Sequence, residues 1–140
     1  MLADFTINIH EARKPLAVQV KVHDSTAALR AAAARYTNRS NRESKGINNS
    51  SDFSETLGVC HRFHMAKNPL CAIVRLAPPH IGAGVMAHEM GHAAVWMWEI
   101  HNTFDRKVPL TCANDEWFCW VLGELVSKTT DKLYQDGVYK

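Results

Sequence analysis

The most constraining feature of the chain is a long apolar segment that carries a short polar motif. Residues 85–100 are almost entirely apolar apart from four residues, which predicts a buried helix. Inside this segment stand His88, Glu89 and His92, in the spacing His-Glu-x-x-His. At 100° per residue, the two histidines lie only ~40° apart around the helix and ~6 Å apart along it. The pattern therefore places both imidazoles on one face of a helix.

This arrangement suits a single metal ion. Two imidazoles and a carboxylate on an otherwise apolar helix are costly to bury without partners, and a metal would satisfy them together. Zinc is the expected metal for His88, His92 and a third nitrogen or oxygen ligand. Glu89, turned by ~100° from His88, can lie beside the metal and accept a proton from water. The sequence thus predicts one Zn²⁺ per chain, and the alternative is a histidine pair satisfied within the core.

A third ligand must come from farther along the chain. Glu116 is the expected one, because it lies in the first turn of the next helix, which can pack antiparallel to the motif helix. An acidic residue at a helix start is also favoured by the helix dipole without any metal. His101 could reach the site only if the first helix ended and the chain folded back. Three other candidates stay open at this point: Asp105, Asp115 and Glu124.

Alternation and composition predict an α+β chain of two strands, a helix, a β-hairpin and two more helices. The expected strands cover residues 5–9, 16–22, 57–65 and 70–76, and the expected helices cover residues 26–35, 85–100 and 115–133. Asp24 or Ser25 offers an N-cap for the first helix. The polar residues 38–54 are expected to form a mobile or functional loop. The 140 residues suffice for one domain, which we expect to span 1–140.

Charge and hydropathy limit the expected partners and location. The net charge of +2 is too small to indicate a nucleic-acid or membrane-binding protein by itself. No apolar run reaches the ~18–20 residues of a membrane span, and the first ten residues lack a signal-peptide pattern. A cytoplasmic protein with reduced cysteines is expected. The basic residues of 30–45 are interpreted as a solvated face, so nucleic-acid binding is not predicted.

A second histidine-containing segment contains Cys60, His61 and His64. Along a strand, Cys60 and His64 would point to one face and His61 to the other. We therefore predict no second metal site and an exposed histidine on a structural strand.

The motif His88-Glu89-Met90-Gly91-His92, with a glutamate on the next expected helix, resembles the gluzincin metallopeptidases. It is most similar to their small cytosolic members, the IrrE/ImmA-like peptidases of bacteria and phages. The resemblance implies a minimal zincin-like fold, with a small sheet packed on an N-terminal helix, the motif helix and a C-terminal glutamate helix. It also implies that His88, His92 and Glu116 hold zinc and that Glu89 is the base.

The resemblance implies zinc-dependent hydrolysis of a peptide bond in a protein or peptide substrate, with Glu89 activating a zinc-bound water. Residues 71–76 could pair with an extended substrate by strand addition. Two alternatives remain. One is an inactive zincin-like interaction module with structural zinc. The other is a site like that of the SprT-like proteases, which His101-Asn102-Thr103-Phe104 faintly resembles, with His101 as third ligand.

Overall fold

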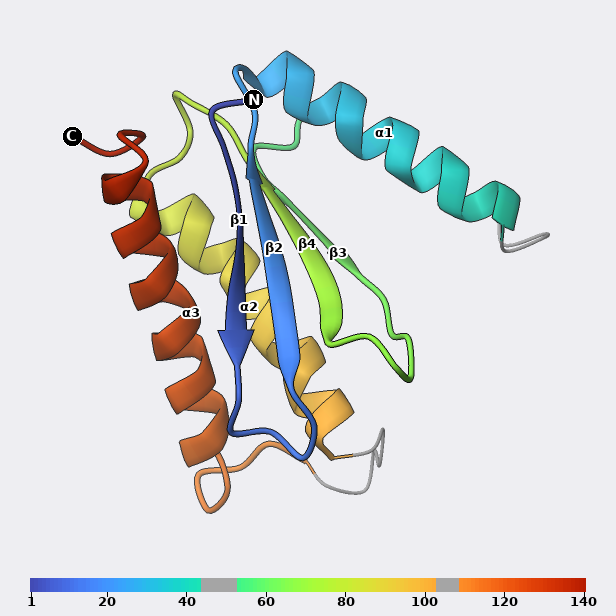
Figure 1. Cartoon of the computed structure of the whole chain (residues 1–140), viewed down its shortest axis with the longest axis vertical. Helices are drawn as coiled ribbons and strands as arrows, with labels where there is room; N and C mark the ends of the chain where they lie inside the picture. The colour runs from blue at the N-terminus through green and yellow to red at the C-terminus, as the bar shows by residue number, and fades with distance from the viewer. Residues whose placement is uncertain (44–52, 103–108) are drawn as a thin grey trace.

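The computed structural model of the chain describes residues 1–43, 53–102 and 109–140. These residues form an α+β fold of a four-stranded mixed sheet and three helices, in the predicted order (Figure 1). The strands are β1 (Ala3–Ile9), β2 (Leu16–Val22), β3 (Val59–Arg62) and β4 (Leu70–Leu76). The helices are α1 (Thr26–Glu43), α2 (Ala83–His101) and α3 (Glu116–Gln135).

The sheet has the strand order β1-β2-β4-β3. β1 is antiparallel to β2, β2 is parallel to β4, and β3 is antiparallel to β4. β4 is therefore an interior strand, since Val74 faces Val20 on one side and Cys60 on the other. The prediction that residues 71–76 accept a substrate strand is wrong, because both edges of that strand are already paired. The edge strand next to β4 is β3.

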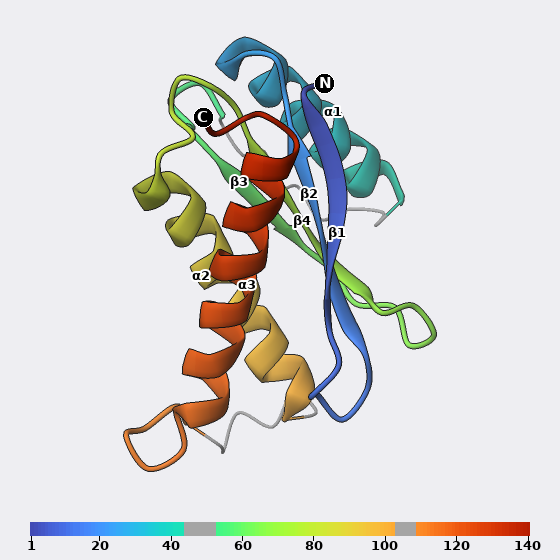
Figure 2. The same ribbon diagram turned by 60° about the vertical axis from the view of Figure 1, so that its left-hand side comes forward.

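The two faces of the sheet are covered differently (Figures 1 and 2). α2 packs on one face against β3 and β4, and α3 packs on the same face against β1. α1 packs on the other face. The larger core lies under α2 and α3 and includes the fully buried Val20, Met90 and Leu125. The smaller core lies under α1. It consists of Leu29, Ala33, Val59 and Ala77, with Phe53 packed against it.

α1 begins where the sequence predicts but ends later. The Ser25 hydroxyl accepts a hydrogen bond from the Ala28 amide at 3.1 Å, which caps the first turn. The helix continues to Glu43, so the part of the expected loop at 38–43 is helical instead. Four of the residues after Tyr36 are weak helix formers (Thr37, Asn38, Ser40 and Asn41), but arginines are interspersed among them, and the sequence has no glycine or proline before Gly46. Residues 44–52 of the expected loop lie outside the described residues.

α2 and α3 are antiparallel neighbours. The ring of Trp117, near the start of α3, stacks on His101 at the end of α2 with centroids 4.1 Å apart. Farther along, the Thr129 hydroxyl contacts the Met90 sulfur at 4.0 Å. These two contacts fix which part of α3 lies beside each turn of α2. Within the described residues, no helix has the combination of length and hydropathy that would cross a membrane.

Candidate metal centre

The two motif histidines meet on the outer face of α2. Their Nε2 atoms lie 3.2 Å apart, and the His88 side chain is 67% exposed. Two ligands of a tetrahedral zinc, each at ~2.1 Å from the metal, are about 3.4 Å apart. The pair therefore has the separation that one metal ion requires. Its exposure also argues against the alternative of histidines satisfied within the core.

Glu89 lies beside this pair but on the buried side of the helix. It is 7% exposed, and its Oε1 atom is 4.0 Å from the His88 Nε2. Burial raises the pKa of the Glu89 carboxyl, and the charge of His88 opposes that shift. A buried carboxylate next to the two nitrogens is positioned to exchange a proton with a molecule bound there.

A cavity of about 420 Å³ opens directly at the motif, between the start of α2 and the chain leading into β3. The cavity is lined by Thr56, Leu57, Gly58, Gly84, Val85, His88 and Glu89. A β-carbon at Gly58 would lie 3.0 Å from both the Glu89 Cγ and the Val85 Cγ1, so any larger residue there would push one of these side chains aside. Sequence reasoning missed Gly58, which falls inside the expected strand 57–65 but in the structure immediately precedes the shorter β3.

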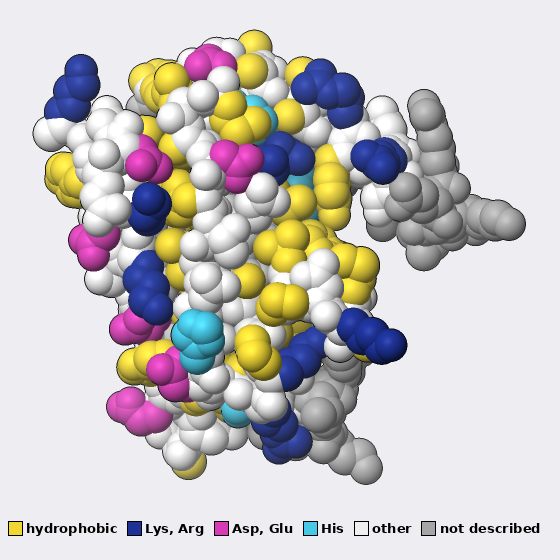
Figure 3. Space-filling view, viewed as in Figure 1, with side chains coloured by type: hydrophobic (Ala, Val, Ile, Leu, Met, Phe, Trp, Pro, Cys, Tyr) yellow, Lys and Arg dark blue, Asp and Glu magenta, His cyan; other side chains and the backbone are white. Residues whose placement is uncertain are grey.

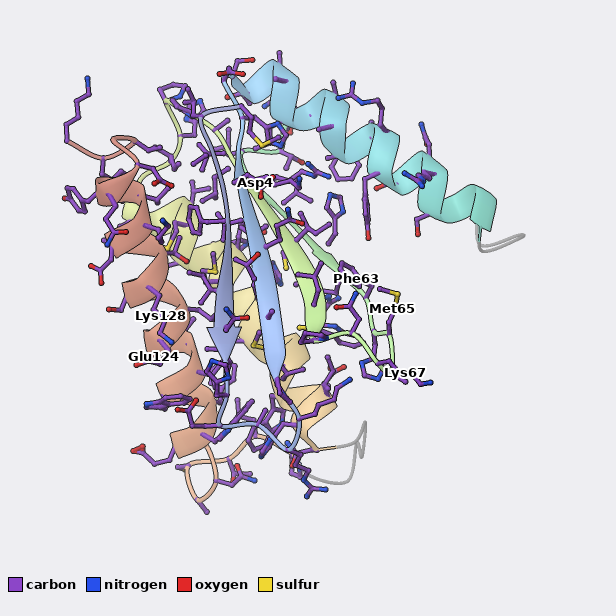
Figure 4. All side chains as sticks on the ribbon, viewed as in Figure 1. Asp4, Phe63, Met65, Lys67, Glu124 and Lys128 are labelled. Atoms are coloured by element: carbon purple, nitrogen blue, oxygen red, sulfur yellow. The ribbon has the colours of Figure 1, made fainter. Side chains whose placement is uncertain are left out.

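The edge strand β3 is fixed to the same helix. The Trp96 indole donates a hydrogen bond to the Phe63 carbonyl at 2.9 Å, and the Arg62 guanidinium lies over the Trp96 ring. Figure 4 shows Phe63 where β3 leads into the connection that bears Met65 and Lys67. The Phe63 amide donates a hydrogen bond to the Cys71 carbonyl in β4. Because the main-chain groups of successive residues alternate between the two edges of a strand, those of Cys60 and Arg62 point to the edge of β3 away from β4. Within residues 1–43, 53–102 and 109–140, this edge of β3 has no paired strand, and it runs beside the candidate site.

The structure does not bring Glu116 to the histidine pair. Glu116 is exposed in the first turn of α3, next to the Trp117 ring that stacks on His101. His88 precedes His101 by thirteen residues, a rise of about 20 Å along a helix. The antiparallel packing places residues near Thr129, not Glu116, beside the motif. The expected third ligand therefore lies at the opposite end of α2.

The other candidate ligands are not assembled with the pair either. His101 stays within α2, and its Nδ1 accepts a hydrogen bond from the Arg13 amide at 3.3 Å. Glu124 forms an ion pair with Lys128 at 3.2 Å, on the side of α3 that faces β1 (Figure 4). Asp115 immediately precedes Glu116 at the start of α3, which is the end away from the histidine pair. Asp105 lies outside the described residues. Among the described residues, no three histidine, cysteine, aspartate or glutamate side chains form a metal-binding group.

The second histidine-containing segment differs from expectation. Cys60 and His61 point to opposite faces of β3 as predicted, with Cys60 packed against the larger core. The exposed histidine of this segment, however, is His64, and His61 is only 8% exposed. The reason is that α1 covers this face, and the Tyr36 ring of α1 packs on His61 with centroids 4.2 Å apart.

Comparisons with protein families, with curated proteins and with solved structures find no match.

Proposed function

We propose that the chain is a zinc-dependent peptidase in which His88 and His92 hold the metal and Glu89 is the general base. The observation that carries the proposal is the pair of Nε2 atoms 3.2 Å apart with a buried carboxylate beside them. A satisfied core pair would not leave the His88 side chain 67% exposed. A purely structural site would have no use for Glu89 at this position. The arrangement of sheet, α2 and α3 is proposed to be zincin-like.

Zinc, when bound, lowers the pKa of water and polarises the carbonyl group of a scissile bond. Glu89 would accept the proton of the attacking water and later donate it to the leaving amine. The side chain is held for this role by its own burial and by close contact with Gly58. The cavity at Gly58 and Val85 gives the substrate access to this carboxylate.

An extended substrate would pair with the free edge of β3. In the described part of the chain no strand pairs with the main-chain groups of Cys60 and Arg62 there, and strand addition relies on such groups for affinity. Arg62 also lies near His92, whose pKa is lowered by burial, by His88 and by Arg62. The neutral imidazole is the form that binds a metal.

A second candidate function has one observation in its favour. The described residues supply two protein ligands where a zinc peptidase uses three. A zincin-like interaction module, with zinc serving stability alone, is consistent with that. Zinc binding and hydrolysis therefore have to be tested separately.

Zinc affinity is measured first, by competition with a chromophoric chelator, on the whole chain and on single variants. We expect about one zinc per chain, at least tenfold weaker binding in His92→Ala, and unchanged binding in Glu89→Gln, because a ligand is lost only in the first. In the described packing, Glu116→Ala and His101→Ala also keep the metal. Loss in Glu116→Ala would show that α3 shifts along α2 when zinc binds. Equal affinity of His92→Ala and the unaltered chain would overturn the metal site.

Hydrolysis is measured next, on a library of fluorogenic peptides and on a denatured protein, with zinc present. A peptidase loses cleavage in Glu89→Gln while its zinc affinity is unchanged. If the zinc-loaded chain cleaves nothing in either assay, the interaction module is the better assignment. Cleavage that survives in Glu89→Gln would refute the proposed role of that residue.

A further inference from the structure

A second polar centre lies on the face of the sheet that α1 covers, away from the histidine pair of α2. Its central residue is Arg75 of β4, which is 7% exposed. The Arg75 Nε donates a hydrogen bond to the His61 Nε2 at 3.0 Å, and its Nη1 lies 3.2 Å from the His23 Nε2. His61 and His23 are themselves 8% and 6% exposed. Three buried polar side chains from separate parts of the sheet thus form one cluster.

The cluster fixes a positive charge with uncharged hydrogen-bond partners. A buried arginine normally pairs with a carboxylate, because its guanidinium stays charged. Burial, followed by the charge of Arg75, lowers the pKa of His61 to about 4. The same two causes lower the pKa of His23. Both imidazoles are therefore neutral at pH 7. Neutral imidazoles accept hydrogen bonds from Arg75 and hold it rigidly, but they carry no negative charge. Arg75 is attracted electrostatically by Asp4 and by the Tyr36 ring, whose centroid lies 5.8 Å from the Arg75 Cζ.

This charge lines a pocket of about 570 Å³ between the sheet and α1. The lining residues are Met1, Lys21, His23, Ala32, Arg35, Tyr36, Arg39 and Arg75, and none of them is acidic. Figure 3 shows basic and histidine side chains near α1 over the upper part of the sheet, with an acidic side chain beside them. Burial lowers the pKa of Arg75, Tyr36 raises it, the charge of Arg35 lowers it and the charge of Asp4 raises it. Arg75 therefore interacts electrostatically with a second guanidinium group, which repels it, as well as with a carboxylate.

The nearest described carboxylates are already engaged. Asp4, labelled in Figure 4, accepts hydrogen bonds from Gln19 at 2.8 Å and from Lys21 at 3.0 Å. The terminal amine of Met1 pairs with Asp24 at 2.7 Å. Asp4 still attracts Arg75 electrostatically, but its hydrogen bonds go to Gln19 and Lys21, and Arg75 and Arg35 are two cations that line one pocket. An anion between them would relieve their repulsion and gain charge-assisted hydrogen bonds.

We propose that this pocket binds the phosphate group of a small phosphorylated ligand, with Arg75 at its base and Arg35 at its mouth. A phosphate offers several acceptor oxygens and up to two negative charges, which matches two guanidinium forks better than a single carboxylate does. The pocket is also larger than inorganic phosphate needs, which leaves room for a group such as a nucleoside. This site is independent of the metal centre, which lies on the other face of the sheet.

The test is calorimetric titration with inorganic phosphate and, separately, with a nucleoside monophosphate, at constant ionic strength and with chloride as the reference anion. Arg35→Gln removes one cation from an exposed position, so the chain should still fold. Lys67→Gln is the matched control, because it makes the same charge change on the β3–β4 connection. Figure 4 shows Lys67 far from Asp4, which is hydrogen-bonded to the pocket residue Lys21. We expect binding at least about tenfold weaker in Arg35→Gln and unchanged in Lys67→Gln, because only the first loses a charged hydrogen bond. Tighter binding of the nucleotide than of phosphate would identify the larger ligand.

The imidazole resonances of His23 and His61 provide a second, independent readout by NMR. Phosphate that binds in the pocket shifts both resonances, since both rings contact Arg75. Binding that leaves them unmoved would place the anion elsewhere and overturn the proposal. Equal losses in Arg35→Gln and Lys67→Gln would also overturn it, because they indicate general charge attraction. The proposal would also be overturned if an oligonucleotide bound with steep salt dependence and neither phosphate nor the nucleotide bound. That result would assign the surface to nucleic acid.

Discussion

The face of the sheet under α2 and α3 and the face under α1 bury very different side chains. Under α2 and α3 lies a continuous apolar layer, and the polar groups of the motif lie at its margin, where the His88 side chain reaches solvent. Under α1 the apolar core is small, and Arg75 is buried beside it with two histidines. The first face gains its stability from area removed from water. The second depends on hydrogen bonds that hold a charge in place.

The difference shows how two kinds of polar site arise. His88, Glu89 and His92 belong to one helix, so helix geometry alone brings them together. His23, His61 and Arg75 come from three separate segments and meet only because β3, β4 and the end of β2 are neighbours in the sheet. A local site is visible in a sequence as a spacing, and a site assembled across strands is not.

The largest difference between the faces is expected from truncating one leucine in each core. Leu125→Ala should lower the free energy of unfolding by about 4 kcal/mol, and Leu29→Ala by about 2 kcal/mol. Both side chains are fully buried, but Leu29 lies in a small cluster, where the surroundings can relax into the space left behind. Urea unfolding monitored by circular dichroism measures both values. An equal or larger loss in Leu29→Ala would contradict the ranking of the two cores.

The α1 face should also make the protein sensitive to acid. The pKa of His61 is about 4 in the folded chain and about 6.5 in the unfolded chain. Between these two pH values the unfolded chain binds a proton at His61 that the folded chain does not bind. Stability is therefore fully present above this window and is lost as the pH falls through it, by up to about 3 kcal/mol for His61. His23 contributes in the same direction.

The variant His61→Gln isolates this effect, because glutamine can still accept the hydrogen bond from Arg75 but does not titrate. Urea unfolding at several pH values should give it a flatter dependence than the unaltered chain. His10→Gln, at an exposed position, is the control and should leave the slope unchanged. An unchanged slope in His61→Gln would mean that this face is not the acid-sensitive one.

The smallest expected effect concerns two glycines on the α2 and α3 side. Gly58→Ala should cost about 1–2 kcal/mol, because the added carbon would meet Glu89 and Val85 at 3.0 Å. Gly123→Ala, inside α3 with nothing within 4 Å, should instead stabilise the protein by about 0.5–1 kcal/mol. Thermal unfolding compares the two directly. A neutral Gly58→Ala would show that the chain beside Glu89 is less tightly packed than described.

Much of the fold follows from local pattern. The bounds predicted for β2 and β4 are those observed, because alternating or continuous apolar residues end at clear turn or proline signals. The end of α1 was not predictable in this way. Polar residues of weak helix propensity allow either a helix or a loop, and the sequence there contains no strong terminator.

The sequence by itself determined the pairing of His88 with His92 and the place of Glu89 beside them, because each turn of a helix repeats the same geometry. Only the tertiary structure decided that Glu116 lies far from that pair. The reason is that α2 continues to His101 before α3 returns antiparallel, so that residues near Thr129 reach the motif. The tertiary structure alone also decided that Arg75 joins His61 and His23. Strand order and the covering helix determine such contacts, and neither leaves a periodic signal in the chain.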